Sequence, residues 1–245
     1  MSEPRIDPNF PYGLDRPGLT RRLAGFGMFA GVVTMIAAVA LDISSAEGLI
    51  VLALLAICIG CLGLSAQMFR TSRTTKIQAS DRLLLGLDLE GDETGLDLGC
   101  GTGLLAAGLS VALPRGRVIA VDAWVTKQLQ PNGKDVAKET LRSAGVKGVQ
   151  VRTGTIRELP VSDASVDVAV SRDVLALLPN RAARAEAVAE LHRVLRPGGR
   201  VALLEPFISD EVRDLLRDAG FSDVTRSRRW WRLFPVPRLV TGRRD

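Results

Sequence analysis

An acidic residue and three evenly spaced glycines stand near the middle of the 245-residue sequence, in LDLGCGTGLLA (residues 96–106). Asp97 precedes Gly99, Gly101 and Gly103, and an apolar helical pattern follows them. Glycines at such positions allow a positive φ and let a ligand touch the backbone. A dinucleotide-binding loop has the different spacing G-x-G-x-x-G and wraps a pyrophosphate. The carboxylate in this loop would instead repel phosphate and attract an ammonium or sulfonium group, so the stretch predicts a site for a cationic ligand.

Segments with strand and helix patterns alternate around this loop. Strands are predicted at residues 94–98, 117–122, 148–153, 165–171 and 200–205, and helices at 103–113, 134–144, 180–196 and 209–219. Residues 221–244 have the pattern of two further strands around a proline-containing turn. This alternation indicates a mostly parallel sheet with helices on both faces. In such a sheet the carboxyl end of the first strand, where the glycines lie, borders a ligand crevice.

Five segments, in this order and spacing, resemble the class I S-adenosylmethionine-dependent methyltransferases. They are LDLGCGTG (96–103), VIAVD (118–122), ELPVSDASVDVAVS (158–171), ELHRVLRPGGRVALLEP (190–206) and LLRDAGFSDV (215–224). The sequence is most similar to the branch that includes the C-methyltransferases of ubiquinone and menaquinone biosynthesis. The resemblance covers roughly residues 80–245. It implies an α/β fold, a doubly wound, seven-stranded and mostly parallel Rossmann-like sheet with one reversed strand near its end, and S-adenosylmethionine as the cofactor.

The resemblance also implies which residues contact the cofactor. The glycine loop would approach its methionine half, Asp97 its ammonium group, and Asp122 both ribose hydroxyls. Where the family usually has Gly-Asp-Ala after the third strand, this chain has Gly154-Thr155-Ile156, and Thr155 is a weaker partner for the adenine. The expected cofactor-binding residues are Asp97, Gly99, Cys100, Gly101, Gly103, Asp122, Ala123, Trp124, Thr155, Ile156 and Ser171.

The acceptor side of the predicted site carries fewer signals. Transfer of a methyl group by in-line displacement depends mainly on positioning, and a base is needed only where the acceptor loses a proton. Asp173, just after the fourth strand, is the candidate base, and an ion pair with Arg172 or Arg181 is the other interpretation of this residue. The only histidine, His192, is predicted on a helix that packs away from the cofactor. No metal site is predicted, since Cys58-x-x-Cys61 lies in an apolar run without a partner pair.

Two uncharged runs of 19 residues, at 23–41 and 48–66, precede the predicted sheet. A helix of that length, rising ~1.5 Å per residue, nearly crosses a ~30 Å hydrocarbon layer, so the pair predicts a transmembrane helical hairpin. Small residues in Gly27-x-x-x-Gly31 and Ala56-x-x-x-Gly60 would let the two helices approach closely. Basic residues flank the pair of runs, and acidic residues lie in the connection between them. The basic residues are Arg16, Arg21, Arg22, Arg70, Arg73 and Lys76, and the acidic residues are Asp42 and Glu47. By the positive-inside rule both termini and the catalytic domain are cytoplasmic.

Two other interpretations of the apolar runs stay open. A signal peptide would explain the first run, and Ala38-Val39-Ala40 resembles a cleavage site, although the leader is long and a second run follows directly. A buried helical hairpin of a soluble protein would need polar faces, which these runs lack.

These patterns predict four parts of the chain. They are an N-terminal cytoplasmic segment (1–22), the hairpin (23–66), a basic linker without periodicity (67–79) and a methyltransferase domain (80–245) with a short helix beginning at Ser80 or Asp81. Because the first strand of the sheet begins only near residue 94, we expect a fragment starting near Arg73 to be soluble and to bind the cofactor.

The charge of the chain bears on its partners. The formal net charge is +5, and residues 226–238, RSRRWWRLFPVPR, interleave arginine with tryptophan and phenylalanine. Such a mixture favours an anionic membrane surface over nucleic acid in a chain with two apolar runs, and an ordinary sheet hairpin with exposed arginines is the other interpretation. The sequence therefore predicts an integral membrane methyltransferase that uses a lipophilic or membrane-associated small-molecule acceptor. The alternative is a membrane scaffold whose cofactor domain has lost catalysis. The weak Thr155 position favours it, as does Ser171-Arg172-Asp173 at the end of the fourth strand, where enzymes that methylate amino groups of nucleic-acid bases usually have Asn/Asp-Pro-Pro-aromatic.

Overall fold

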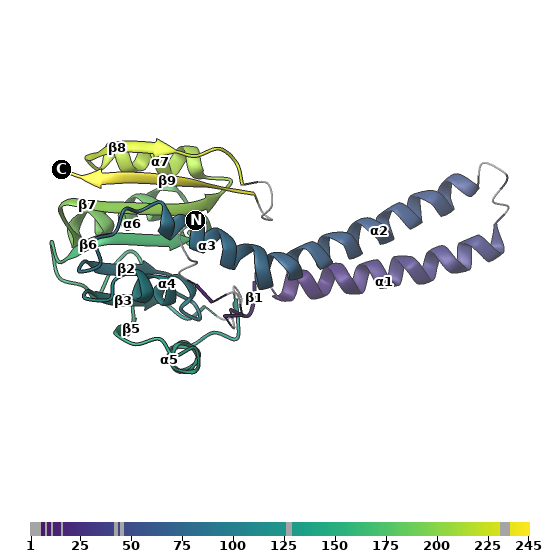
Figure 1. Cartoon of the computed structure of the whole chain (residues 1–245). Helices are drawn as coiled ribbons and strands as arrows, with labels where there is room; N and C mark the ends of the chain where they lie inside the picture. The colour runs from purple at the N-terminus through teal and green to yellow at the C-terminus, as the bar shows by residue number, and fades with distance from the viewer. Residues whose placement is uncertain are drawn as a thin grey trace.

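The chain folds into a seven-stranded sheet covered on both faces by helices, from which a pair of long helices projects (Figure 1). The computed structural model describes residues 6–7, 9–10, 12–15, 17–41, 44, 47–125, 129–230 and 236–245. The strands of the sheet are β2 (Thr94–Leu98), β3 (Arg117–Asp122), β5 (Val149–Thr153), β6 (Val166–Arg172), β7 (Leu195–Pro206), β8 (Phe221–Arg226) and β9 (Pro237–Arg244).

The strand order is β5-β3-β2-β6-β7-β9-β8, and β9 runs antiparallel to both of its neighbours. The chain proceeds from β2 outward to β3 and β5, then returns to β6 on the other side of β2. This reversal places the topological switch point, where doubly wound folds bind ligands, between β2 and β6. The predicted fold class, including one reversed strand near the end, is confirmed.

Alternating side chains of the parallel strands build a separate core on each face. In β3, Val118 and Ala120 pack into one core, while Ile119 and Val121 pack into the other. The helices over the first core are α3 (Lys76–Leu85), α4 (Leu104–Ala112) and α5 (Lys134–Ser143), and those over the second are α6 (Arg181–Val194) and α7 (Ser209–Asp218). Burial on both faces explains the nearly continuous apolar runs of the inner strands.

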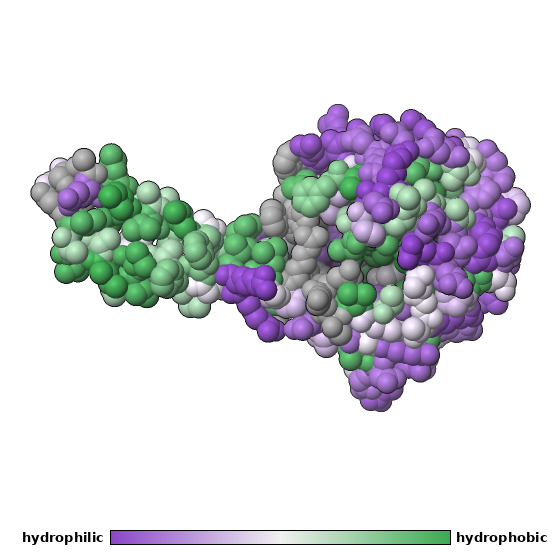
Figure 2. Space-filling view, turned by 180° about the vertical axis from the view of Figure 1, so that it is seen from behind, coloured by the Kyte–Doolittle hydropathy of each residue, from purple (hydrophilic) through white to green (hydrophobic). Residues whose placement is uncertain are grey.

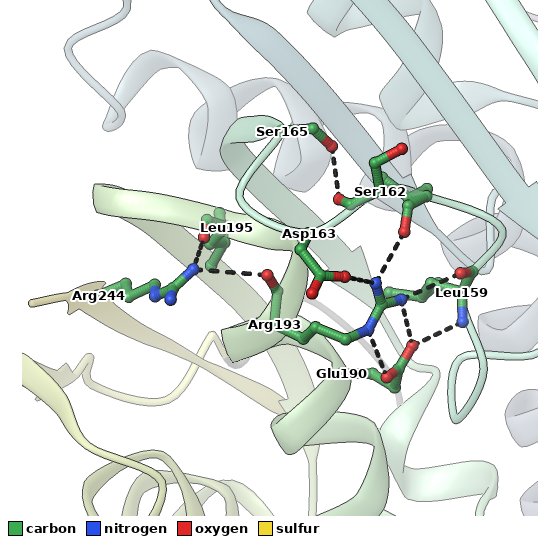
Figure 3. A network of polar contacts seen from close by, with 9 residues as sticks. Leu159, Ser162, Asp163, Ser165, Glu190, Arg193, Leu195 and Arg244 are labelled. Atoms are coloured by element: carbon green, nitrogen blue, oxygen red, sulfur yellow. Dashed lines mark hydrogen bonds and ion pairs between the residues drawn. The ribbon is translucent and has the colours of Figure 1, made fainter.

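Arg193, in the last turn of α6, fixes this helix to the loop before β6 (Figure 3). Its guanidinium donates to the carbonyl oxygens of Leu159 at 3.2 Å and Val161 at 3.0 Å, and it forms ion pairs with Glu190 and Asp163 at 2.7 and 2.5 Å. Glu190 in turn accepts the N–H of Leu159 at 2.8 Å. The hydrogen bond from Arg193 lowers the pKa of Glu190. Two of the landmark segments in the sequence therefore meet in one network of the scaffold.

Helices α1 (Pro17–Ala40) and α2 (Gly48–Arg70) form the projecting pair. Both are long and apolar enough to cross a membrane, and their most apolar windows are only 17% and 11% buried. A hairpin in the core of a soluble protein would be mostly buried, so this exposure argues against that interpretation of the two apolar runs. Apolar surface covers this pair in Figure 2, whereas the sheet domain is largely hydrophilic.

Close packing of α1 on α2 uses glycines of the first helix alone. A Cβ atom at Gly27 would lie 2.9 Å from Leu62, and one at Gly31 would lie 3.2 Å from the Cys58 sulfur. A Cβ atom at Gly60 would meet no described atom within 4 Å. The predicted role of Gly27 and Gly31 is thus confirmed, and that of Ala56-x-x-x-Gly60 is wrong, because both residues of that motif are exposed.

The predicted linker at 67–79 is helical. Helix α2 continues through a π-helical turn, Thr71–Thr75, directly into α3. Thr71, Ser72 and Lys76 are buried against the sheet domain, so tertiary packing gives this polar stretch the order that its sequence pattern does not suggest. The helix start predicted at Ser80 or Asp81 is therefore wrong, and the backbone has no break at residue 80.

The N-terminal segment is part of the sheet domain. Ile6, Phe10 and Tyr12 are buried in the core beneath α3 and α4. Just beyond them, β1 (Leu14–Asp15) pairs with β4 (Leu129–Gln130). A fragment starting near Arg73 would lose these core residues, so the expectation that it binds the cofactor is not supported. Arg16 and Asp42, on which the predicted orientation partly rests, and residues 231–235 of the C-terminal basic stretch lie outside the described residues.

Candidate active site

A cavity of about 350 Å³ lies at the carboxyl ends of β2, β3 and β6. One half is lined by residues of the first three strand ends, among them Asp97, Gly99, Gly101, Asp122, Ala123 and Ile156. The other half is lined by residues that precede the sheet or lie at the end of β6 and just after it, among them Tyr12, Met68, Ser72, Lys76, Arg172 and Asp173. The cavity thus has one wall from the glycine loop and another from the continuation of α2.

The glycine loop is the floor of the first half. Gly99, Gly101 and Gly103 have φ values of +67°, +54° and +93°, which only glycine adopts without strain. A Cβ atom would lie 2.3 Å from Val174 at Gly99 and 2.6 Å from Leu129 at Gly101. Gly99 and Gly101 border the cavity, whereas Gly103 packs against α5 and does not line it.

Asp122 ends β3 with both carboxylate oxygens oriented by the backbone. It accepts the N–H of Gly101 at 2.8 Å and that of Trp124 at 2.6 Å. Ala123 and Val125 line the cavity beside it. Trp124 does not line the cavity, because its indole N–H donates to Thr153 at 2.9 Å on β5. A fixed carboxylate at a strand end suits a vicinal diol, as the resemblance implies for the ribose.

Asp97 is the buried acid of the cavity. Its side chain is 1% exposed and accepts the N–H of Ala106 at 2.8 Å. Burial raises its pKa to about 7, nearby Arg172 lowers it, and Asp122 raises it further. Two carboxylates facing one cavity favour a cationic ligand, so the residues fit the ammonium of S-adenosylmethionine. The neighbouring Cys100 thiol also lines the cavity, and burial raises its pKa well above the usual range, so it stays protonated.

Asp173 lies on the other half of the cavity and is held by two cations. The Lys76 ammonium is 2.7 Å from its carboxylate, and the Arg172 guanidinium is 3.6 Å away. Both cations also lie over the ring of Tyr12, at 5.9 and 4.7 Å from its centre. Arg181 instead pairs with Asp218 at 3.1 Å, so of the two predicted ion-pair partners of Asp173 only Arg172 lies nearby.

Glu205, at the end of β7, supports the loop that follows Asp173. Its carboxylate is fully buried and accepts the N–H groups of Val174, Leu175 and Ala176 at 3.0–3.1 Å. Burial, followed by the charge of Asp173, raises its pKa to about 8, and the three donors favour the ionised form. Asp173 itself has a φ of +61°, a strained value for a non-glycine residue. Glu205 therefore fixes the loop directly after Asp173, whose backbone has a positive φ.

The remaining predicted residues divide between the cavity and its surroundings. Thr155 and Ile156, which are predicted to bind the cofactor, line the cavity. Ser171 is fully buried but is not among the lining residues. His192 packs edge-on against Phe221 at 5.4 Å, on the α6 side of the sheet, away from the cavity as expected.

Sequence reasoning missed the wall built by Tyr12, Met68, Ser72 and Lys76. One signal was present: Met68, Ser72 and Lys76 are spaced four residues apart, which places side chains along one face of a helix. That spacing lay in a stretch too polar and too short to predict a helix. No local pattern connects Tyr12 to residues so distant in the sequence.

Comparison with known proteins agrees with this geometry. Residues 96–203 match a family model described as a methyltransferase domain. The chain is 36% identical over 133 residues to the arsenite methyltransferase of Halobacterium salinarum, covering 54% of this chain and 29% of that protein. It is 32% identical over 120 residues to the demethylmenaquinone methyltransferase of Lactobacillus johnsonii, covering 49% and 46%. The chain thus spans less than half the length of these two relatives.

Solved structures share the fold. A SAM-dependent methyltransferase from Aquifex aeolicus superposes with a TM-score of 0.55 at 21% identity, covering 70% of this chain and 98% of that one. The resemblance seen in the sequence is confirmed: residues 96–203 match the model of a methyltransferase domain, and the chain has the fold of the S-adenosylmethionine-dependent enzyme from Aquifex aeolicus. S-adenosylmethionine is the cofactor that such a domain uses.

Proposed function

We propose that the protein is a membrane-anchored, S-adenosylmethionine-dependent methyltransferase that acts on a lipophilic acceptor. The observation that carries this proposal is the unbroken helix from α2 through the π-helical turn into α3. Met68 and Lys76, on the cavity wall, lie two and ten residues beyond Ala66, where the predicted span ends. At the helical rise per residue this is about 3–15 Å, so the cavity would lie at headgroup depth.

The first half of the cavity would hold the cofactor. Asp97 would pair with its ammonium, Asp122 would accept hydrogen bonds from the ribose hydroxyls, and the backbone of Gly99 and Gly101 would border its methionine portion. Ala123, Val125, Thr155 and Ile156 would border the nucleoside. When bound, the cofactor supplies a methyl group already activated by its sulfonium. The chain needs only to align the acceptor and to shield both from water.

The second half of the cavity would hold the acceptor. Asp173 lines it, and in a reaction whose acceptor carries an acidic proton this carboxylate would accept that proton. The residues of this half would align the acceptor with the methyl group that the bound cofactor supplies. The demethylmenaquinone methyltransferases among the relatives support a lipophilic acceptor.

The membrane part of the proposal places both termini and the sheet domain in the cytoplasm. Arg21 and Arg22 precede the apolar run of α1, and Arg70 follows that of α2, while Glu47 lies in the connection between the helices. This distribution supports a cytoplasmic base of the hairpin. Exposed Phe207, directly after β7, and Arg228 and Arg229 near the start of β9 would face the same membrane surface.

A second candidate is a membrane scaffold that binds the cofactor without transferring the methyl group. The observation in its favour is that Lys76 and Arg172 both form ion pairs with Asp173, so the candidate base is already engaged by two side chains of the protein. Turnover separates the two candidates. Membranes that contain the full chain would be incubated with methyl-labelled S-adenosylmethionine, and label would be followed into the organic extract. The enzyme transfers label to a lipid-soluble product, whereas the scaffold binds the cofactor and transfers none.

Retention in the membrane tests the anchor. We expect the full chain to stay with membranes through washes with high salt and with carbonate. Attachment by arginines alone would be released by salt, because surface charges are screened within ~10 Å at 0.1 M. Release of the protein by these washes would disprove the transmembrane hairpin and leave the cofactor site untouched.

A further inference from the structure

The acceptor half of the cavity has a wall that belongs to the helix leaving the hairpin. Met68, Ser72 and Lys76 line the cavity from successive turns, in the order apolar, hydroxyl, ammonium. Their burial is nearly complete, with exposures of 6%, 1% and 7%. Along this wall, polarity increases with distance from the apolar span. The same gradient occurs in an amphiphile whose chain lies toward the bilayer and whose head group lies at Lys76.

The charges around Lys76 define the head group further. Lys76 and Arg172 are two buried cations that share one carboxylate, Asp173. Arg172 is held in place from several sides, since it donates to Ser80 at 2.6 Å and to the carbonyl of Lys76 at 3.3 Å and lies over Tyr12. Lys76 reaches Asp173 through a long, rotatable side chain, and both residues line the cavity. An ammonium has three N–H donors, and Asp173 accepts one of them from Lys76, so an anionic oxygen of a ligand in the cavity can be a further acceptor of the same side chain.

We infer that Lys76 is the acceptor-binding residue, and that it binds an anionic oxygen in the head group of an amphiphilic acceptor; this inference rests on the proposed function. The oxygen is either a carboxylate that arrives ionised or a hydroxyl of a phenol or enol. In the second case the O–H bond breaks, the proton passes to the Asp173 carboxylate, and the resulting oxyanion remains beside the Lys76 ammonium. Charge is conserved, because one carboxylate is neutralised as one oxyanion forms.

The inference distinguishes Lys76 from a residue that only stabilises the fold. If the Lys76–Asp173 pair were structural, removal of either partner would damage the site equally. If Lys76 binds the acceptor, Asp173 competes with an ionised head group for the ammonium. Removal of Asp173 then leaves the binding of a carboxylate unchanged or makes it tighter, while removal of Lys76 weakens it.

The test uses the full chain in micelles of a non-ionic detergent, saturated with S-adenosylhomocysteine. Dodecanoate, 4-dodecylphenol and dodecanol are the probes, and calorimetry measures their binding. We expect Lys76→Gln to weaken the binding of dodecanoate about 10-fold or more, as for the loss of one charge-assisted hydrogen bond, while Lys76→Arg retains it. Lys138→Gln, on the exposed face of α5, is the matched control and should bind as the unaltered chain does.

Asp173→Asn supplies the decisive comparison. Dodecanoate should bind this variant at least as tightly as the unaltered chain, and if the head group is a phenol or enol, 4-dodecylphenol should bind it more weakly. Equal weakening of dodecanoate in Lys76→Gln and Asp173→Asn would overturn the inference, as would unchanged binding in Lys76→Gln. Binding of S-adenosylhomocysteine, measured in each sample, shows whether the variant is folded. If the unaltered chain does not bind S-adenosylhomocysteine, the proposed function itself is disproved.

Discussion

The backbone N–H of Gly101 donates a hydrogen bond to the carboxylate of Asp122 at 2.8 Å, which joins the glycine loop to the end of β3. The same carboxylate also accepts the N–H of Trp124. One side chain therefore orders two segments of the cavity and would bind the cofactor as well. Loss of this carboxylate should affect both the loop and the ligand.

We expect Asp122→Ala to weaken the binding of S-adenosylmethionine by about 1–3 kcal/mol, through the loss of charge-assisted hydrogen bonds. Asp122→Asn keeps one acceptor oxygen, so its affinity for S-adenosylmethionine should lie between those of the unaltered chain and the alanine variant. Calorimetric titration of the full chain in detergent measures the effect. Unchanged affinity in the alanine variant would contradict the assignment of Asp122 to the ribose.

Replacement of Gly101 should abolish cofactor binding for two reasons that can be separated. A residue with a side chain is strained at a φ of +54°, and its Cβ atom would lie 2.6 Å from Leu129. Gly145→Ala is the control for strain alone, because its φ is +71° and no described atom lies near its Cβ. We expect Gly145→Ala to lower the melting temperature slightly and to bind the cofactor normally. If Gly101→Ala also binds normally, the loop does not cradle the cofactor.

The buried Asp97 makes the stability of the ligand-free protein depend on pH. Its pKa is raised from 3.8 to about 7, so this carboxyl favours folding fully below pH 3.8, and that contribution is lost as the pH rises through 7. Asp97→Asn removes this dependence. The variant should therefore be more stable than the unaltered chain above pH 7, with an upper limit of about 4 kcal/mol at 1.36 kcal/mol per pKa unit.

Thermal unfolding of both proteins without cofactor, between pH 5 and pH 8, measures this difference. The gap in melting temperature should narrow toward pH 5. The same variant should bind S-adenosylmethionine poorly at every pH, because the amide cannot pair with the ammonium. A variant that is less stable at pH 8 than the unaltered chain would show that Asp97 is ionised and stabilising without a ligand.

Arg193 should contribute far more to stability than an exposed arginine with a similar partner. Arg193→Met removes hydrogen bonds to Leu159 and Val161 and leaves Glu190 without its cation. We expect a loss of roughly 2–4 kcal/mol in the free energy of unfolding, as for one partner of a partly buried network. Arg142→Met, which removes an exposed pair with Glu139 on α5, should change it little. Denaturant unfolding compares the two.

Cysteine labelling tests the orientation of the hairpin. A cysteine at Ser44, in the connection between α1 and α2, should react with an impermeant reagent added outside the cell, and one at Lys138 should not. Both positions are exposed in the structure, whereas Ser72 is buried and would be shielded on either side. The background protein would have Cys58, Cys61 and Cys100 replaced by serine or alanine. Labelling of Lys138→Cys in intact cells would reverse the proposed orientation.

The sequence allowed much of the sheet to be predicted, because local patterns determine parallel strands and their helices. The predicted strands at 94–98 and 117–122 match β2 and β3 in both bounds. Several residues that line the first half of the cavity could be named for the same reason, since Asp97 and Asp122 lie at strand positions fixed by a family pattern. That Trp124 lies outside the lining could not be predicted, because the direction of its side chain depends on one hydrogen bond to Thr153, which no spacing encodes.

The acceptor half could not be predicted, because it is assembled from distant segments. Lys76 meets Asp173 only after the helix from the hairpin packs over the end of β6. Tyr12 joins them from a segment that precedes both apolar runs. The polar residues at 71–75 are helical because the domain buries several of them, an effect of tertiary packing that outweighs local propensity.

The burial of Ile6, Phe10 and Tyr12 in the same core as α3 and α4 has a consequence for the number of membrane crossings. The chain on either side of the hairpin belongs to one folded body, so both flanks must end on the same side of the bilayer. Only an even number of crossings meets that condition. A single span, or cleavage after residue 40, would separate these three residues from the core they fill. For the proposed transmembrane hairpin, the fold therefore requires both helices to cross together, and this requirement is independent of the flanking charges.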